Sequence, residues 1–246
     1  MSVATAVKDQ IQQLGGAFMF SREAKAFGQA CGADAFLGPY VRGRGGVLGE
    51  VDADVVTAAF GFFPGDTIRP AWESVSMPAA DAAVGYMEAC REFGRRKLAD
   101  FADARQLADL LEKVAAAAEP AGVPLFAGWR ALPLPEDGPA RLSQLTHVLR
   151  ELRGGLHLIG VLAAGLTPLQ AVLISGSPIK TGPQQAGFYG YPEPYEEVTA
   201  DHRARWEQAE AITDALIAPA FAALTPSEAT TLTDLLPKAH AIGLSR

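Results

Sequence analysis

The sequence is poor in the residues that build metal sites and disulfides. It has two cysteines, Cys31 and Cys90, and four histidines among its 246 residues. Two thiols make neither a disulfide framework nor a four-thiolate zinc site, and the histidines follow no standard metal-ligand spacing. We therefore expect no bound metal and no cofactor, in a protein of the reducing cytoplasm.

Positive charge and long apolar runs are also scarce. The chain has 21 Lys and Arg against 28 Asp and Glu, a formal net charge of −7. Because Lys and Arg supply most of the affinity for phosphate, this balance disfavours a nucleic-acid partner. The longest apolar run, 156–166, is too short to cross a membrane, and residues 1–16 lack the apolar centre of a secretory signal. We expect no membrane contact, and leave the oligomeric state open between monomer and homodimer.

Helical patterns dominate the sequence. Residues 225–228, Thr-Pro-Ser-Glu, form a capping box with proline at the first helical position, and residues 167–170 repeat this device. We expect Pro219 to kink a long helix, and the Gly-, Pro- and Tyr-rich segment 182–199 to form a loop or a short irregular hairpin. Eleven helices are predicted, near 4–14, 22–31, 35–42, 52–62, 79–99, 102–118, 140–153, 157–164, 168–174, 200–223 and 226–239.

The segment 119–139 contains five prolines and predicts a linker. It would separate a first half, 1–118, from a second half, 140–246. The two halves share a weak sequence similarity at an offset of 133 residues, which aligns 30–36 with 163–169 and Gly43 with Gly176. Both stretches show a helix, a glycine that ends it and then a short helix. This order of elements is typical of a helix-turn-helix unit and would occur twice in the chain.

The densest polar group surrounds two histidines in an otherwise apolar region. His147 and Glu151 are four residues apart on one predicted helix, so the carboxylate could orient the imidazole. The glycines at 154–155 are expected to end that helix and turn His157 back toward it. One interpretation is a pocket wall with an acid–base histidine and an anion-holding Arg153. The alternative is an ion-paired helix end with a buried histidine.

Arg44 and several aromatic residues form a second candidate group. Arg44 lies in the Gly-rich stretch 42–49, where its planar guanidinium could hold a carboxylate. No strand precedes this stretch, so we reject a dinucleotide-binding fold, and a solvated arginine in a helix connection is the alternative. The tyrosine-rich segment 188–195 could cover a pocket or contact a partner protein. The aromatic residues could line a ligand cavity or simply form core: Tyr40, Phe60, Phe63 and Trp72.

The C-terminal stretch 197–236 resembles the end of a MarR-type winged-helix regulator, with Thr-Pro-x-Glu followed by Leu-Leu. The chain as a whole resembles an actinobacterial family of tandem winged-helix proteins related to MarR and largely uncharacterised in function. The matching positions are Tyr40, Arg44, Leu48, Gly49, Phe60, Phe63, Pro64, Trp72, Arg153, Gly154, His157, Glu210, Thr213 and Asp214. The chain departs from the family pattern at Leu152 and Gly155, where a histidine and an aspartate are expected.

The resemblance implies a mainly α fold of two fused MarR-like winged-helix units, a pseudo-dimer in one chain with little or degenerate β wing. It also implies a small-ligand site between the helical region and the winged-helix lobes. The expected recognition helices, 52–62 and 168–174, contain no Lys or Arg, and Asp52 and Asp54 would repel phosphate. A DNA-reading surface is therefore disfavoured at both.

These observations predict a small-molecule-binding protein and, as an extension of that role, an enzyme of specialised metabolism acting on an anionic or aromatic organic ligand. A ligand-responsive DNA-binding transcriptional regulator and a protein-interaction module are the alternatives. The predicted catalytic residues are His157, His147 and Glu151. The predicted ligand-binding residues are Tyr40, Arg44, Phe60, Phe63, Trp72 and Arg153.

Overall fold

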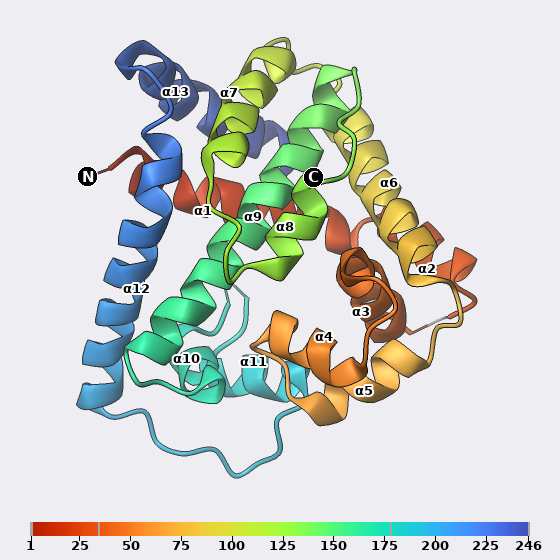
Figure 1. Cartoon of the computed structure of the whole chain (residues 1–246), viewed down its shortest axis with the longest axis vertical. Coiled ribbons are helices and arrows are strands. Elements are labelled where there is room, and N and C mark those ends of the chain that lie inside the picture. The colour runs from red at the N-terminus through yellow and green to blue at the C-terminus, as the bar shows by residue number, and fades with distance from the viewer. Residues whose placement is uncertain (1, 34, 178, 246) are drawn as a thin grey trace.

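The structure, a computed structural model, describes residues 2–33, 35–177 and 179–245. These residues form thirteen α-helices and two short 3-10 helices and contain no strand, only an isolated bridge between Ser177 and Lys180 (Figure 1). The expected mainly α fold with little β wing is therefore confirmed. The helices are α1 (Val3–Gly16), η1 (Ala17–Phe20), α2 (Arg22–Ala30), α3 (Leu37–Gly45), η2 (Gly46–Leu48), α4 (Ala53–Phe60), α5 (Gly65–Glu73), α6 (Ala79–Lys97), α7 (Ala104–Ala117), α8 (Pro124–Arg130), α9 (Gly138–Ala163), α10 (Pro168–Ser175), α11 (Gly182–Tyr189), α12 (Ala200–Phe221) and α13 (Pro226–Gly243).

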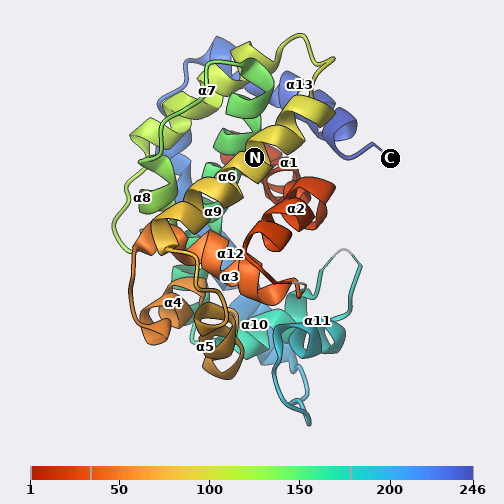
Figure 2. The same cartoon turned by 90° about the vertical axis from the view of Figure 1, so that its right-hand side faces the viewer.

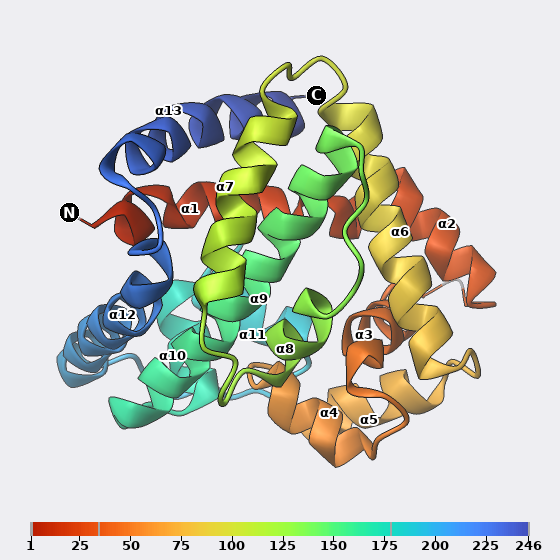
Figure 3. The ribbon, with the colours of Figure 1, turned by 45° about the horizontal axis from the view of Figure 1, so that its top comes forward.

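Helix α9 is the centre of the molecule. It packs against α1, α6, α7, α8 and α12, and Figure 3 shows it running between α7 and α6. Its 26 residues span about 39 Å at 1.5 Å per residue. Buried side chains lie on all its faces, as expected for a helix enclosed by others. His147, Glu151, Arg153 and His157 therefore all lie on one central helix.

The prediction that Gly154 and Gly155 end a helix is wrong, because α9 continues through both. Gly155 allows Val123 to pack directly on the helix backbone, since an added Cβ would lie 2.5 Å from Val123 Cγ1. Gly154 faces open space, with no atom within 4 Å of an added Cβ. Packing around α9 thus offsets the low helix propensity of glycine.

These two glycines provide a matched pair of variants. Gly154→Ala should raise the free energy of unfolding by about 0.5–1 kcal/mol, because it adds helix propensity without a clash. Gly155→Ala should lower it by about 1–3 kcal/mol, because the new methyl group overlaps Val123. Urea unfolding of both variants tests this, and equal shifts would contradict the packing described here.

Two helix-turn-helix pairs lie at one end of the molecule, the first pair being α4–α5 and the second α10–α11 (Figures 1 and 2). In each, an eight-residue helix ends at a glycine with positive φ, Gly61 (67°) or Gly176 (56°), whose N–H donates to the carbonyl four residues earlier. These glycines are 115 residues apart. The offset of 133 instead pairs Gly176 with Gly43, which lies inside α3.

Three helices have no counterpart among the eleven predicted ones, namely α5, α8 and α11. Each begins within one residue of a proline. Pro64 precedes α5, Pro124 begins α8, and Pro183 lies in the first turn of α11. The expected loop over 182–199 is thus wrong for its first half, because proline there starts a helix. Pro219 lies in the last turn of α12 and does not interrupt it.

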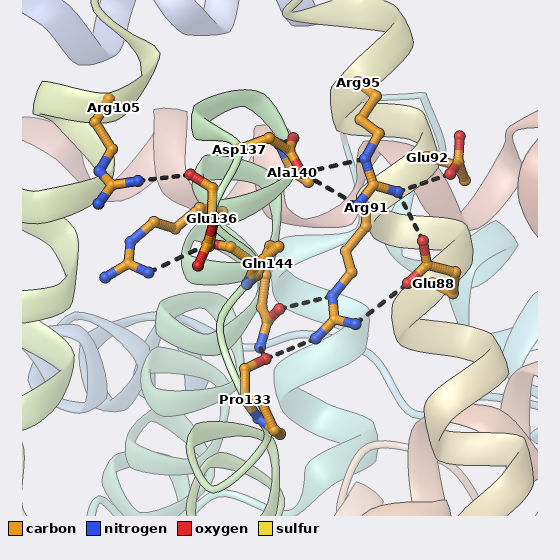
Figure 4. Close-up of polar contacts among 12 residues, drawn as sticks. Glu88, Arg91, Glu92, Arg95, Arg105, Pro133, Glu136, Asp137, Ala140 and Gln144 are labelled. Carbon is orange, nitrogen blue, oxygen red and sulfur yellow. Dashed lines mark hydrogen bonds and ion pairs between the residues drawn. The ribbon is translucent and has the colours of Figure 1, made fainter.

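The proline-rich segment 119–139 is anchored to the rest of the molecule. Leu125, Phe126 and Trp129 of α8 are buried in a core that also contains residues of α1 and α13. After α8 the chain is held to α6 by two arginines (Figure 4): Arg91 Nη2 donates to Pro133 O at 2.7 Å, and Arg95 Nη2 donates to Asp137 Oδ2 at 3.1 Å. Both arginines also pair with Glu88. The division of the chain into two halves stays a prediction.

Among the described residues, no single helix is both long and apolar enough to cross a membrane. Helices α9 and α10 reach that length and composition only as a pair, and they are bent by 111°.

Candidate functional site

A central cavity of about 900 Å³ lies between α9 and the two helix-turn-helix pairs. Its volume falls within the range of about 300–1,000 Å³ that is typical of small-molecule sites. Seven of the nine predicted site residues line it, and His147 and Trp72 do not. The seven are Tyr40, Arg44, Phe60, Phe63, Glu151, Arg153 and His157.

A buried ion pair joins the first half of the chain to α9 at the cavity wall. Arg44 binds both oxygens of Glu151, from Nε to Oε1 at 3.0 Å and from Nη2 to Oε2 at 2.8 Å. Arg150 Nη1 donates to the same Oε1 at 2.8 Å. Burial opposes ionisation of Glu151, but the two arginines outweigh it and lower its pKa to about 2. The carboxylate that Arg44 holds is therefore one of the protein's own.

Arg44 is also enclosed by aromatic rings. Its guanidinium carbon lies 4.3 Å from the centre of the Phe60 ring, and its Nη1 donates to the Tyr40 hydroxyl at 3.3 Å. Burial lowers the pKa of Arg44, but Glu151 more than compensates, so the net pKa is raised. These contacts fix the guanidinium in place and use it to connect α3 with α9.

His147 lies in the core, outside the cavity. It is fully buried, and its Nδ1 lies 3.3 Å from Gly15 O, so this nitrogen carries the proton and donates. The rings of Phe18 and Trp129 meet it edge-on. Burial lowers the pKa of His147 to about 4, so the ring is neutral at pH 7. Its position matches the alternative of a buried core histidine.

Trp72 also packs away from the cavity. Its Nε1 donates to Val51 O at 3.1 Å, and the guanidinium carbon of Arg42 lies 4.3 Å from the centre of its ring. It therefore holds α5 against the end of α3 and the chain that follows η2.

His157 borders the cavity, and its hydrogen bonds define which ring nitrogen carries the proton. Its Nδ1 lies 3.1 Å from Thr213 Oγ1 and 3.4 Å from Glu210 Oε1. The Thr213 hydroxyl donates to Ala209 O at 2.7 Å, so its oxygen accepts from the imidazole. Burial lowers the pKa of His157 to about 4, against the opposing effect of Glu210. The neutral ring therefore carries its proton on Nδ1, which leaves Nε2 as an acceptor.

Glu210, on α12, gathers three groups from α1 and α9. Its Oε2 accepts from Lys8 Nζ at 2.9 Å and from Arg153 Nη2 at 2.8 Å, while Oε1 faces His157. Burial raises the pKa of Glu210, but Arg153, Lys8 and His157 together bring it below its usual value. The ionised carboxylate thus ties α1, α9 and α12 together beside the cavity.

Aromatic rings form much of the remaining wall. The Phe62 ring stacks on His157 with centroids 5.8 Å apart, and the Trp206 ring meets His157 edge-on at 4.9 Å. Tyr189, from the tyrosine-rich segment, contacts Phe63 at a centroid distance of 4.0 Å and lines the cavity.

The predicted site omits Trp206, Glu210 and Tyr189. Glu210 and Thr213 are among the positions that match the family, and Trp206 lies one turn before Glu210 on the same helix face, so the sequence contained an indication of this part of the site.

The helices of the two helix-turn-helix pairs carry few basic residues. The predicted recognition helices, 52–62 and 168–174, coincide with α4 and α10, which are the first helices of their pairs. Of the second helices, α11 carries no charged residue, and α5 carries one basic residue, Arg69, which pairs with Asp54.

Within the described part of the chain, no cluster of three or more His, Cys, Asp or Glu residues is arranged to hold a metal ion.

A family model described as a helix-turn-helix family matches residues 4–195. No curated protein and no solved structure matches the chain significantly.

Proposed function

The chain belongs to this helix-turn-helix family, and we propose that it uses the fold to bind a small organic molecule, aromatic or anionic, in the central cavity. One observation carries the proposal: the cavity brings together polar and aromatic residues that are far apart in sequence, from Tyr40 to Glu210. Concave sites with an apolar wall and a few oriented polar groups are the usual form of small-molecule sites.

The finer form of the proposal is a pair of fused MarR-like units around one ligand site. The similar lengths and glycine stops of α4 and α10 support it, as does the position of the cavity between the two pairs. If the bound molecule reacts, His157 is the proposed acid–base residue, because its neutral ring borders the cavity and Glu210 faces its protonated nitrogen. Glu151 would then position Arg44 and would not touch the ligand.

A neutral fluorescent aromatic molecule, N-phenyl-1-naphthylamine, tests the binding proposal. Gly154→Leu places a side chain in the open space beside α9, so it should weaken binding of this probe by about tenfold, or roughly 1.4 kcal/mol. The matched control is Ala24→Leu, in a separate groove of about 280 Å³ beside α2. Unchanged binding in Gly154→Leu, or a loss in Ala24→Leu alone, would reject the cavity as the site.

The family description favours one alternative, a DNA-binding regulator. Its supporting observation is that both helix-turn-helix pairs lie at the same end of the molecule (Figure 1). We expect weak DNA binding, because the only basic residue of the two second helices already pairs with Asp54. This alternative is tested by measuring the affinity for the DNA upstream of its own gene at increasing salt concentration. Tight binding that weakens steeply with salt would establish a DNA-binding regulator.

A further inference from the structure

The charges around the central cavity cancel, and this restricts the chemistry of its ligand. Arg44 and Arg150 both donate to Glu151, and Arg153 donates to Glu210. The carboxylate of Asp9, which is exposed, also borders the cavity. The cavity wall thus carries three arginines and three carboxylates, 3 − 3 = 0, and each arginine already donates to Glu151 or Glu210. An anionic ligand would have to compete with Glu151 or Glu210 for these arginines, and displacing Glu151 would leave a buried carboxylate without its counter-ions.

The polar atom that His157 leaves free is an acceptor. Its Nδ1–H is committed to Thr213 and Glu210, and Nε2 makes no hydrogen bond to any described residue. The exposed part of the side chain, 11% of its surface, borders the cavity. A neutral imidazole in this tautomer receives a proton donor, such as a hydroxyl group, and offers nothing to a carboxylate.

The groups beside His157 favour a flat partner. Phe62 stacks on one face of the imidazole and Trp206 meets it edge-on. Aromatic side chains in this arrangement attract further rings by stacking or edge contacts. The cavity, at about 900 Å³, is large for a ligand with a single ring.

We propose that the ligand is a polycyclic aromatic molecule with a hydroxyl group, whose O–H donates to His157 Nε2 while its rings lie against Phe62 and Trp206. This inference rests on the proposed function and names its ligand class. It selects the aromatic class and rejects the anionic one, because the arginines at the cavity are already paired with carboxylates.

Three naphthalene probes of similar size test the inference in calorimetric titrations at pH 7. They are 2-naphthol, which donates a hydrogen bond, 2-methoxynaphthalene, which does not, and 2-naphthoate, which is an anion. The wild-type chain should bind 2-naphthol about 3- to 10-fold more tightly than 2-methoxynaphthalene, the usual gain from one hydrogen bond. It should bind 2-naphthoate most weakly.

The variant His157→Phe keeps the ring and removes the acceptor. It should lose the preference for 2-naphthol and still bind 2-methoxynaphthalene, with circular dichroism confirming that it folds. Equal binding of naphthol and methoxynaphthalene by the wild-type chain, or tighter binding of naphthoate, would overturn the inference without any variant.

The two proposals fail in different ways. If N-phenyl-1-naphthylamine binds in a Gly154-dependent manner and 2-naphthol is not preferred, only the hydroxyaromatic inference fails. If neither that probe nor any of the three naphthalenes binds in the cavity, the proposed function fails with it.

Discussion

Replacing Glu151 with Gln should lower the free energy of unfolding by about 3–5 kcal/mol at pH 7. The side chain of Glu151 is 1% exposed and carries the only negative charge that Arg44 contacts among the described residues. A glutamine amide has nearly the same shape and no charge, so the variant leaves the Arg44 guanidinium buried without its counter-ion. Denaturant unfolding followed by circular dichroism measures the loss.

Two further variants separate the charge from other effects. The double variant Arg44→Met, Glu151→Leu should recover most of the lost stability, because an apolar pair replaces a buried ion pair at little cost. Glu73→Gln, at an exposed position of α5, should change stability by less than about 0.5 kcal/mol. A loss below about 1 kcal/mol for Glu151→Gln would mean that water reaches Arg44 and that the pair is not a structural link.

Stability should fall between pH 6.5 and pH 4, and His147 should cause much of that fall. Its pKa is about 4 in the folded protein against 6.5 for an ordinary histidine, because burial opposes the charged form. In this pH range the unfolded chain takes up a proton that the folded chain does not. Stability from this group is therefore complete above pH 6.5 and lost as pH falls, by on the order of 3 kcal/mol at pH 4.

His147→Phe isolates this contribution. Unfolding free energies measured from pH 8 to pH 4 should show, between pH 6.5 and pH 4, a slope smaller by up to about 1.4 kcal/mol per pH unit in the variant, the value for one proton. The difference between the two proteins at pH 8 gives the effect of packing alone. His157, whose pKa is also lowered to about 4, remains in the variant and keeps part of the slope. Parallel curves would show that His147 is not buried as a neutral ring.

Capping boxes identified some helices from the sequence, although α11, which also begins with one at Thr181, was missed. The capping boxes at Thr167 and Thr225 are present as predicted, with the Gln170 and Glu228 side chains each returning to the cap backbone. Helices α8 and α11 lie in segments whose proline content predicts a linker and a loop, and α5 has no start signal beyond Pro64 before it. Gly154 and Gly155 led to the opposite error, because they predicted a helix end where α9 continues. Gly155 packs against Val123 inside the helix.

Seven of the nine predicted site residues line one cavity, but the sequence did not indicate their contact partners. Arg44 and Glu151 both belonged to the predicted site, but their 107-residue separation gives no indication in the sequence that they bind each other. The i,i+4 spacing suggested that Glu151 serves His147, whereas the tertiary fold turns the carboxylate to two arginines. Charge pairs between distant segments depend on packing, which local spacing does not specify.

The central position of α9 has a consequence for the order in which the chain can assemble. Helix α1 is made before the other described helices, but it packs against α9, α12 and α13, which follow it by more than 120 residues. Contacts of such long sequence separation require a large loop to close before they stabilise anything, which slows folding. The growing chain must therefore carry the apolar face of α1 uncovered through most of its translation. A ribosome-bound fragment ending before residue 138 should remain open to proteases.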